Sequence, residues 1–291
     1  MYSINRVMVC LDLSDLDDTL IAYTAMIRKI FDINAVYFHH VAKTLDLPER
    51  IAEKYPGLLA PSDEAIEKAI QEKTDKYFQE DENCSLDIVV REGNPTDKIL
   101  RWSDIKEIDL IVLGRKTDLK GSGVLPGELA KVSHCSLLFV PESAKMEINR
   151  ILVPVDFSKT SGFAFQEALD IHKATNCEIT LQNSYDVPSG YHTIGKSYEE
   201  FAEIMRQHAY EDAESFLKKN NAPDGVNISL TLDDERDPAE RACDVAKDIN
   251  ADMIIIGSKG RTGIASLLLG SVADKMTQCN ADTPPLRLKV V

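Results

Sequence analysis

Three glycines and a serine in the last fifth of the chain have the residue types and spacing to hold an anion. Gly257, Gly260 and Gly270 follow the apolar run 253–256, and Ser271 comes directly after the last glycine. Glycine lets backbone amides approach an anion because no Cβ stands in the way. A helix that begins near Ser271 would add unpaired N–H groups and the positive end of its dipole. This stretch therefore predicts a site that holds phosphate groups.

The surrounding residues predict a strand, a loop and a helix in that order. Residues 253–256, Met-Ile-Ile-Ile, are typical of a buried parallel strand, which Gly257 ends. A helical pattern begins after Gly270. A phosphate-binding glycine motif requires this context. The alternative is a βα turn in which the glycines only permit tight packing.

Lys259 and Arg261 are the basic residues of the predicted loop. Either side chain could screen the charge of a phosphate. An exposed base is by default solvated and contributes little binding energy, so both interpretations stay open for this pair.

The spacing G-x2-G-x9-G-[ST] resembles the nucleotide-binding signature of the universal stress protein family, in its ATP-binding branch. Gly257, Gly260, Gly270 and Ser271 match its four positions. The resemblance implies an α/β fold of the adenine-nucleotide α-hydrolase-like kind, with ATP as the ligand, with or without Mg²⁺.

The segment Pro154-Val155-Asp156 follows a second predicted strand. The resemblance implies that it lies along the adenine and ribose, with the Asp156 carboxylate accepting hydrogen bonds. A carboxylate near a triphosphate would repel it, so this group belongs at the sugar end. Asp156 could also act as the N-cap of the helix that follows, and the two roles can coexist.

By the same resemblance, residues 182–185 are expected to line the adenine edge. The family usually has His-Val where this chain has Asn183 and Ser184, which is a departure. Ser184 would still offer its backbone groups to the base. The predicted nucleotide-binding residues are Pro154, Val155, Asp156, Ser184, Ile256, Gly257, Lys259, Gly260, Arg261, Gly270, Ser271 and Val272.

The chain contains two copies of one unit, related by a shift of 143 to 144 residues. Residues 6–14 parallel residues 150–158, and residues 109–114 parallel residues 252–257. A period this long indicates a duplicated domain and excludes a solenoid repeat. The predicted domains are residues 1–144 and 145–291, the first with a degenerate nucleotide motif and the second with an intact one.

Strand-like and helix-like segments alternate in each half, which implies parallel strands with helices on both faces. The predicted fold class is therefore α/β, with two tandem doubly wound domains, each with a five-stranded parallel sheet. Ligands of such sheets lie beyond the carboxyl ends of the strands, where Asp156 and Gly257 both stand. The predicted strands are residues 7–11, 35–41, 85–90, 110–113 and 137–140, then 151–155, 179–182, 227–232, 253–256 and 286–290. The predicted helices of the first half are residues 17–31, 62–81, 95–106 and 129–133.

The first half departs from the glycine pattern. Aligned on Gly114 and Gly127, Thr117 replaces the middle glycine and Glu128 replaces the terminal hydroxyl residue. A β-branched residue is a poor occupant of a positive-φ position. Glu128 would place a carboxylate where phosphate belongs. We expect that this half does not hold ATP in the same way and acts as a structural partner or serves another ligand.

His39 and His40 end the second predicted strand. Because adjacent strand residues point to opposite faces, the two imidazoles cannot readily chelate one ion. Packed or hydrogen-bonded histidines are the favoured interpretation.

Residues 286–290 alternate apolar and basic side chains, which predicts an edge strand with one wetter face. In the resembled family such edge strands meet across a dimer interface. The resemblance thus implies an intrachain pseudo-dimer of the two domains, or a homodimer of the whole chain.

Composition limits the class of protein. The 291 residues are 44% hydrophobic and 28% charged, with a formal net charge of -15. This charge argues against partners such as nucleic acid or an anionic membrane. Six scattered cysteines without a C-x-x-C pair fit a reducing compartment, and no apolar run approaches the ~18 residues of a membrane span. We expect a cytoplasmic protein.

The function predicted from these features is that of a cytoplasmic ATP-binding stress-response protein, a regulatory module with one competent site in the second domain. The alternative is an enzyme of a related α/β fold that slowly hydrolyses ATP or transfers a nucleotidyl group. No G-x4-G-K-[ST] loop and no evident general base support catalysis. A third hypothesis, a scaffold that has lost nucleotide binding, conflicts with the intact second motif.

Overall fold

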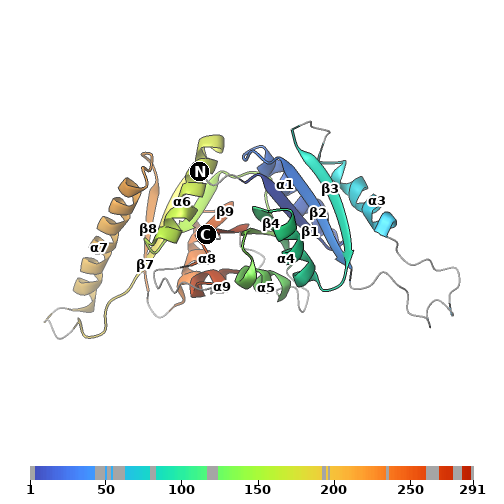
Figure 1. Ribbon diagram of the computed structural model, residues 1–291. Coiled ribbons are helices and arrows are strands. Elements are labelled where there is room, and N and C mark those ends of the chain that lie inside the picture. Colours follow the sequence, from blue (N-terminus) through green and yellow to red (C-terminus); the bar gives the residue numbers. More distant parts are fainter. Residues whose placement is uncertain are drawn as a thin grey trace. The chain divides into compact units, whose positions relative to one another are not determined.

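The computed structural model describes residues 4–42, 50, 54, 63–78, 83–116, 124–191, 195, 197–233, 236–259, 269–277 and 284–289 (Figure 1). The chain divides into two compact units, Met1–Leu129 with Leu137–Glu142 and Ala130–Ser136 with Ser143–Val291. Each is an α/β unit with a parallel sheet and helices on both faces, as predicted.

The strands of the N-terminal half follow the order β3-β2-β1-β4-β5. β1 pairs in parallel with β2 and β4, and β2 pairs in parallel with β3. The strands are β1 (Arg6–Leu11), β2 (Ala35–Ala42), β3 (Ser85–Glu92), β4 (Leu110–Arg115) and β5 (Ser136–Pro141). The helices are α1 (Leu16–Arg28), α3 (Asp63–Thr74), α4 (Pro95–Ile105) and α5 (Val124–Val132).

The strands of the C-terminal half follow the matching order β10-β9-β6-β7-β8. β6 pairs in parallel with β7 and β9, β7 with β8, and β10 with β9. The strands are β6 (Arg150–Pro154), β7 (Glu178–Tyr185), β8 (Asn227–Leu232), β9 (Met253–Gly257) and β10 (Leu286–Lys289). The helices are α6 (Lys159–Thr175), α7 (Tyr198–Lys219), α8 (Pro238–Asp248) and α9 (Ser271–Thr277).

The duplication extends to individual hydrogen bonds at the start of each sheet. Asp109 Oδ2 accepts from the amides of Asn5 and Arg6 at 2.8 and 2.9 Å. Asp252 Oδ2 accepts from the amides of residues 149 and 150 at 3.0 and 3.1 Å. Each aspartate joins its strand to the first strand of the same sheet, so the repeat predicted from sequence is also a repeat of contacts.

Helix starts follow local sequence rules in both halves. α4 begins at Pro95 after the N-cap Asn94, whose side chain accepts from the amide of Asp97. α8 begins at Pro238 after the N-cap Asp237. Proline suits the first position of a helix because its missing N–H would have no intrahelical partner there.

Two expectations about elements are wrong. The helix predicted at residues 129–133 begins at Val124, so Gly127 and Glu128 lie inside α5. The predicted wetter face of the last strand is buried at Arg287, which is 2% exposed and donates to Glu167 of α6, with Nε and Oε1 2.6 Å apart. This ion pair lets a basic residue face a helix, because each buried charge neutralises the other. Residue 290 lies outside the described residues.

Candidate functional site

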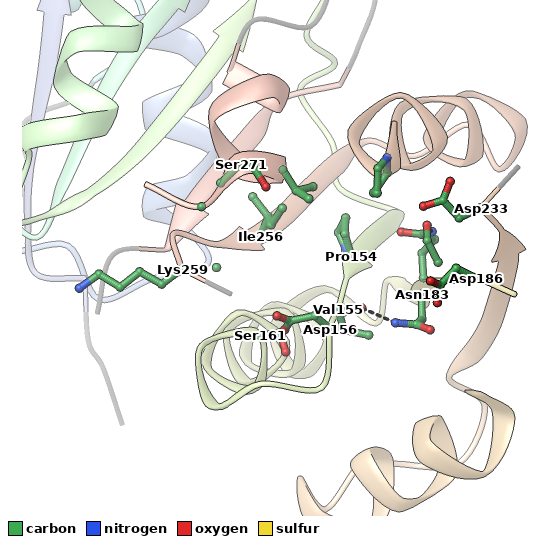
Figure 2. A pocket seen from close by; sticks show the side chains of 17 residues that line it. Pro154, Val155, Asp156, Ser161, Asn183, Asp186, Asp233, Ile256, Lys259 and Ser271 are labelled. Atoms are coloured by element: carbon green, nitrogen blue, oxygen red, sulfur yellow. Dashed lines mark hydrogen bonds between the residues drawn. The ribbon is translucent and has the colours of Figure 1, made fainter. Parts of the chain in front are cut away.

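A cavity of about 370 Å³ lies beyond the carboxyl ends of β6, β7 and β9 (Figure 2). This is the edge of the sheet where doubly wound folds bind ligands. Its volume lies in the range of small-molecule sites. The lining residues are Pro154, Val155, Asp156, Ser161, Gln182, Asn183, Ser184, Asp186, Asp233, Pro238, Ile256, Gly257, Lys259, Gly270, Ser271, Val272 and Ala273.

The structure brings the predicted site residues together. Every predicted nucleotide-binding residue that the structure describes lines this cavity. Gly260 and Arg261 lie outside the described residues. The cavity draws on segments more than 100 residues apart in sequence, from residue 154 at the end of β6 to residue 271 at the start of α9.

Gly257 has a packing role at this site. A Cβ on Gly257 would lie 3.0 Å from the carbonyl carbon and oxygen of Thr160 and 3.3 Å from the amide nitrogen of Ser161. Both of those residues belong to the first turn of α6, whose backbone would have to move. Gly257 therefore permits tight packing of β9 on α6, and the close approach also brings α6 to the edge of the cavity.

Two hydrogen bonds hold the ends of the glycine loop. The Gly270 amide donates to the carbonyl of Ser258 at 2.8 Å, so the chain leaves and re-enters the site at one point. The Thr160 hydroxyl donates to the carbonyl of Lys259 at 2.5 Å, which ties the start of the loop to α6. These two hydrogen bonds thus fix the backbone at Lys259 and at Gly270, directly before Ser271.

Asp156 does not cap α6. The N-cap is Ser158, whose hydroxyl accepts from the amide of Ser161 at 3.2 Å. Asp156 Oδ1 instead accepts from the amide of Ser158 at 3.0 Å, across a turn in which Phe157 has a φ of 61°. Left-handed backbone at a non-glycine residue is strained and is common at functional sites. The turn holds the Asp156 carboxylate at the cavity wall.

The end of β7 contributes polar residues that sequence reasoning placed only in part. Asn183 donates from Nδ2 to the Val155 carbonyl at 2.8 Å and so joins β7 to the end of β6. Gln182 Nε2 donates to the hydroxyls of Ser184 and Thr231 at 3.0 and 2.9 Å. These bonds fix the side chains of the wall before any ligand arrives.

Five further residues of the wall were missed, namely Ser161, Asp186, Asp233, Pro238 and Ala273. Asp233 comes directly after β8 and Asp186 directly after β7. The rule that ligands lie beyond the carboxyl ends of strands was applied to β6 and β9, and the same rule would have found these two carboxylates.

The charged and polar groups divide the cavity into two ends, as Figure 2 shows. Asp186 and Asp233 lie at the β7–β8 end, and Ser271 and Lys259 lie at the opposite end. The Lys259 side chain extends away from Asp156, and no ion pair of Lys259 is found among the described residues. An anion would avoid the two carboxylates and favour the Ser271 end.

The first unit has its own cavity of about 260 Å³, beyond β1, β2 and β4. Lys116 Nζ pairs with Asp12 Oδ2 at its edge. Burial raises the pKa of Asp12, but hydrogen bonds from Lys116 and Ser14 outweigh it and hold that pKa below its usual value. Glu128 accepts a hydrogen bond from the Thr96 hydroxyl at 2.7 Å.

Two further features concern only the part of the chain that the structure describes. There, no helix is both long and apolar enough to cross a membrane. Within the same residues, no group of three or more His, Cys, Asp or Glu side chains is arranged to hold a metal ion.

Comparison with known proteins identifies the family. The model of the universal stress protein family matches residues 3–141 and again residues 147–279. Two universal stress proteins of Methanocaldococcus jannaschii are similar to this chain, one with 32% identity over 142 residues and the other with 27% identity over 161 residues. Each alignment covers 48% of this chain and, respectively, 81% and 94% of the relative.

A solved universal stress protein from Archaeoglobus fulgidus matches the whole length. The alignment covers 99% of this chain and 97% of the solved chain, with a TM-score of 0.62 and 16% sequence identity. The likeness is therefore one of fold. Because the family model matches twice along one chain, the protein belongs to the universal stress protein family in its tandem two-domain form.

Proposed function

We propose that the second domain, residues 145–291, binds ATP and that the protein acts as a regulatory nucleotide-binding module with this one competent site. The observation that carries the proposal is the cavity of about 370 Å³, which the described members of the predicted motif all line. In the first domain, residues 1–144, the motif is degenerate and Lys116 is paired with Asp12.

The distribution of charge supports one orientation of the nucleotide. The phosphates fit the end with Ser271 and the amides that follow Gly270, away from Asp186 and Asp233. Hydrogen bonds from neutral donors to a charged phosphate are stronger than those between neutral groups. Because α9 is short, with seven residues, its dipole is weak. The Ser271 hydroxyl and the nearby amides would therefore contribute more to the binding of phosphate than the helix dipole does.

The carboxylates suit the other end of the molecule. Asp156, Asp186 and Asp233 are acceptors for ribose hydroxyls or for the exocyclic amine of adenine. Mg²⁺, where present, usually keeps several waters and binds substrate phosphates together with one or two carboxylates. The site therefore does not need a dedicated metal cage.

The test begins with the purified full chain. Denaturing it and separating the released small molecules by chromatography identifies any nucleotide carried through purification. Added ATP, AMP and cyclic AMP are then titrated by calorimetry, and ATP binding is expected. Adenine nucleotides that fail to bind, or ATP that is converted stoichiometrically to ADP or AMP over time, would overturn the regulatory-module proposal.

A matched pair of glycine variants assigns the site. Gly270→Val adds a side chain at the cavity and is expected to abolish ATP binding. Gly127→Val changes the equivalent glycine of the first domain, where an added Cβ meets nothing within 4 Å, and should leave ATP affinity unchanged. Equal loss in both variants would contradict a site confined to the second domain.

A further inference from the structure

The cavity of the first domain is built for a different ligand from that of the second. Where α6 has Thr160 and Ala164 facing its sheet, α1 has Leu16 and Leu20, and both leucines line the first cavity. Val41 stands where β7 has Ser184. The lining residues are Cys10, Leu11, Asp12, Leu16, Leu20, His39, Val41, Pro95, Ile99, Leu113, Gly114, Lys116, Leu125 and Pro126. Most of this wall is aliphatic.

His39 is the polar group deep in that wall. It is 1% exposed, and among the residues that the structure describes neither ring nitrogen has a hydrogen-bond partner. Its neighbour His40 is satisfied, because Nδ1 lies 2.9 Å from the Leu11 carbonyl. A buried polar group without a partner is destabilising, and native structures keep few of them. His39 therefore has unused hydrogen-bonding capacity beside a cavity.

The imidazole of His39 is neutral at physiological pH. Burial, and to a smaller extent the charges of Arg91 and His40, lower its pKa to about 4. A neutral imidazole has one donor and one acceptor nitrogen. It can recognise a polar group without requiring that the ligand carry a charge.

The charges of the wall do not favour an anion. Among the described lining residues the formally charged side chains are Asp12 and Lys116, and they pair with each other. α5 starts at Val124, so Gly127 lies within the helix and is not the residue before its first turn. The arrangement that suits phosphate in the second domain is therefore absent from the described part of this wall.

We propose that the first domain binds a small, uncharged, mainly apolar molecule whose one polar group hydrogen-bonds to His39. The cavity volume of about 260 Å³ exceeds that of an aliphatic cavity that holds benzene, ~150 Å³. It lies just below the range of drug-sized sites, ~300–1,000 Å³. A molecule with a single ring and an amide or hydroxyl group fits these limits. The inference is independent of ATP binding in the second domain.

The test uses benzamide as the probe and the full chain as the protein. Benzamide is uncharged and has both a donor and an acceptor. Binding is read by calorimetry and by the emission of Trp102, the chain's one tryptophan, whose ring centroid lies 6.2 Å from that of His39. We expect saturable binding that changes this emission. Benzoate, the charged analogue of the same shape, is expected to bind at least ~10-fold more weakly, since burial of a charge is costly.

Three variants connect the binding to this cavity. His39→Leu replaces the imidazole with an apolar side chain and should weaken benzamide binding about fivefold, which corresponds to the loss of one net hydrogen bond. Val41→Phe fills the cavity and should abolish binding. Ser184→Phe makes the same change at the matching position of the second domain, and should leave benzamide binding unchanged while it removes ATP binding.

Several outcomes would overturn the proposal. They are no benzamide binding by the wild-type chain, equal affinity for benzoate, and binding that survives Val41→Phe or is lost in Ser184→Phe. Unchanged affinity in His39→Leu would remove the hydrogen bond from the proposal. If Val41→Phe fails to fold, the comparison of wild type with His39→Leu and Ser184→Phe decides the question by itself.

Discussion

At the scale of single residues, the Ser271 hydroxyl is a side-chain donor at the end of the second cavity where we propose that phosphate binds. We predict that Ser271→Ala weakens ATP binding about tenfold, because a hydrogen bond to a charged group contributes roughly 1.5–3 kcal/mol. Calorimetric titration of the variant with ATP measures the change. The melting temperature should stay the same, since Ser271 is exposed.

Ser258→Ala is the matched control for this prediction. Ser258 is buried beside the same loop, and its hydroxyl has no hydrogen-bond partner among the described residues. Removing that hydroxyl should leave ATP affinity unchanged. If Ser258→Ala weakens ATP binding as much as Ser271→Ala does, the effect comes from disturbance of the loop and the assignment of Ser271 is wrong.

His39 makes the stability of the first domain depend on pH. Its pKa is about 4 in the folded chain and about 6.5 in the unfolded chain. Below about pH 6.5 the unfolded state binds a proton that the folded state does not, so stability falls as the pH drops toward 4. The full loss amounts to about 3 kcal/mol and is complete below the folded pKa.

His39→Gln is expected to remove this part of the pH dependence. Glutamine stands at the matching position of β7, as Gln182, and it does not titrate. Urea unfolding followed by Trp102 emission, at about pH 7 and about pH 4, measures the free energy of unfolding of the wild-type chain and of His39→Gln. If the free energy of unfolding falls equally in the wild-type chain and in His39→Gln, other groups cause the acid sensitivity.

At the scale of elements, each sheet depends on a glycine where a strand passes the first turn of a helix. A Cβ on Gly257 would meet the backbone of Thr160 at 3.0 Å, whereas a Cβ on Gly114 would meet Cδ2 of the Leu16 side chain. A leucine side chain can rotate, but a helix backbone cannot move without repacking. We predict that Gly257→Ala destabilises its domain by about 1–3 kcal/mol and Gly114→Ala by less.

The single tryptophan separates the two effects. Trp102 lies in α4 of the first unit, so its emission reports unfolding of that unit, and circular dichroism reports both. Gly257→Ala should shift the unfolding transition measured by circular dichroism and leave the transition measured by Trp102 emission unchanged. Gly114→Ala should shift the transition measured by Trp102 emission. The reverse order of destabilisation would contradict the close approach of β9 and α6.

At the scale of the whole molecule, duplication followed by divergence has produced two cavities with different walls. We predict that the full chain binds one ATP, because the first cavity has leucines and an Asp12–Lys116 pair in place of the polar wall. The stoichiometry of ATP in calorimetry checks this directly. Binding of ATP should leave Trp102 emission unchanged, since that residue belongs to the other unit. A stoichiometry of two would contradict the division of roles.

The sequence by itself determined the α/β alternation, the duplication and the family. Period and alternation are local properties, so the predicted strand 227–232 coincides with β8. The rule on strand ends depends only on chain order, and for that reason it selected Asp156 and Gly257 as neighbours.

Only the tertiary structure decided which side chains share a wall and which have partners. The burial of Arg287 depends on Glu167, 120 residues away, and no local pattern encodes that pairing. The ring nitrogens of His39, which have no partner among the described residues, arise in the same way, since its neighbours come from separate elements. Burial and hydrogen bonding are properties of the packed chain. The order of residues along the sequence does not show which distant residues will meet.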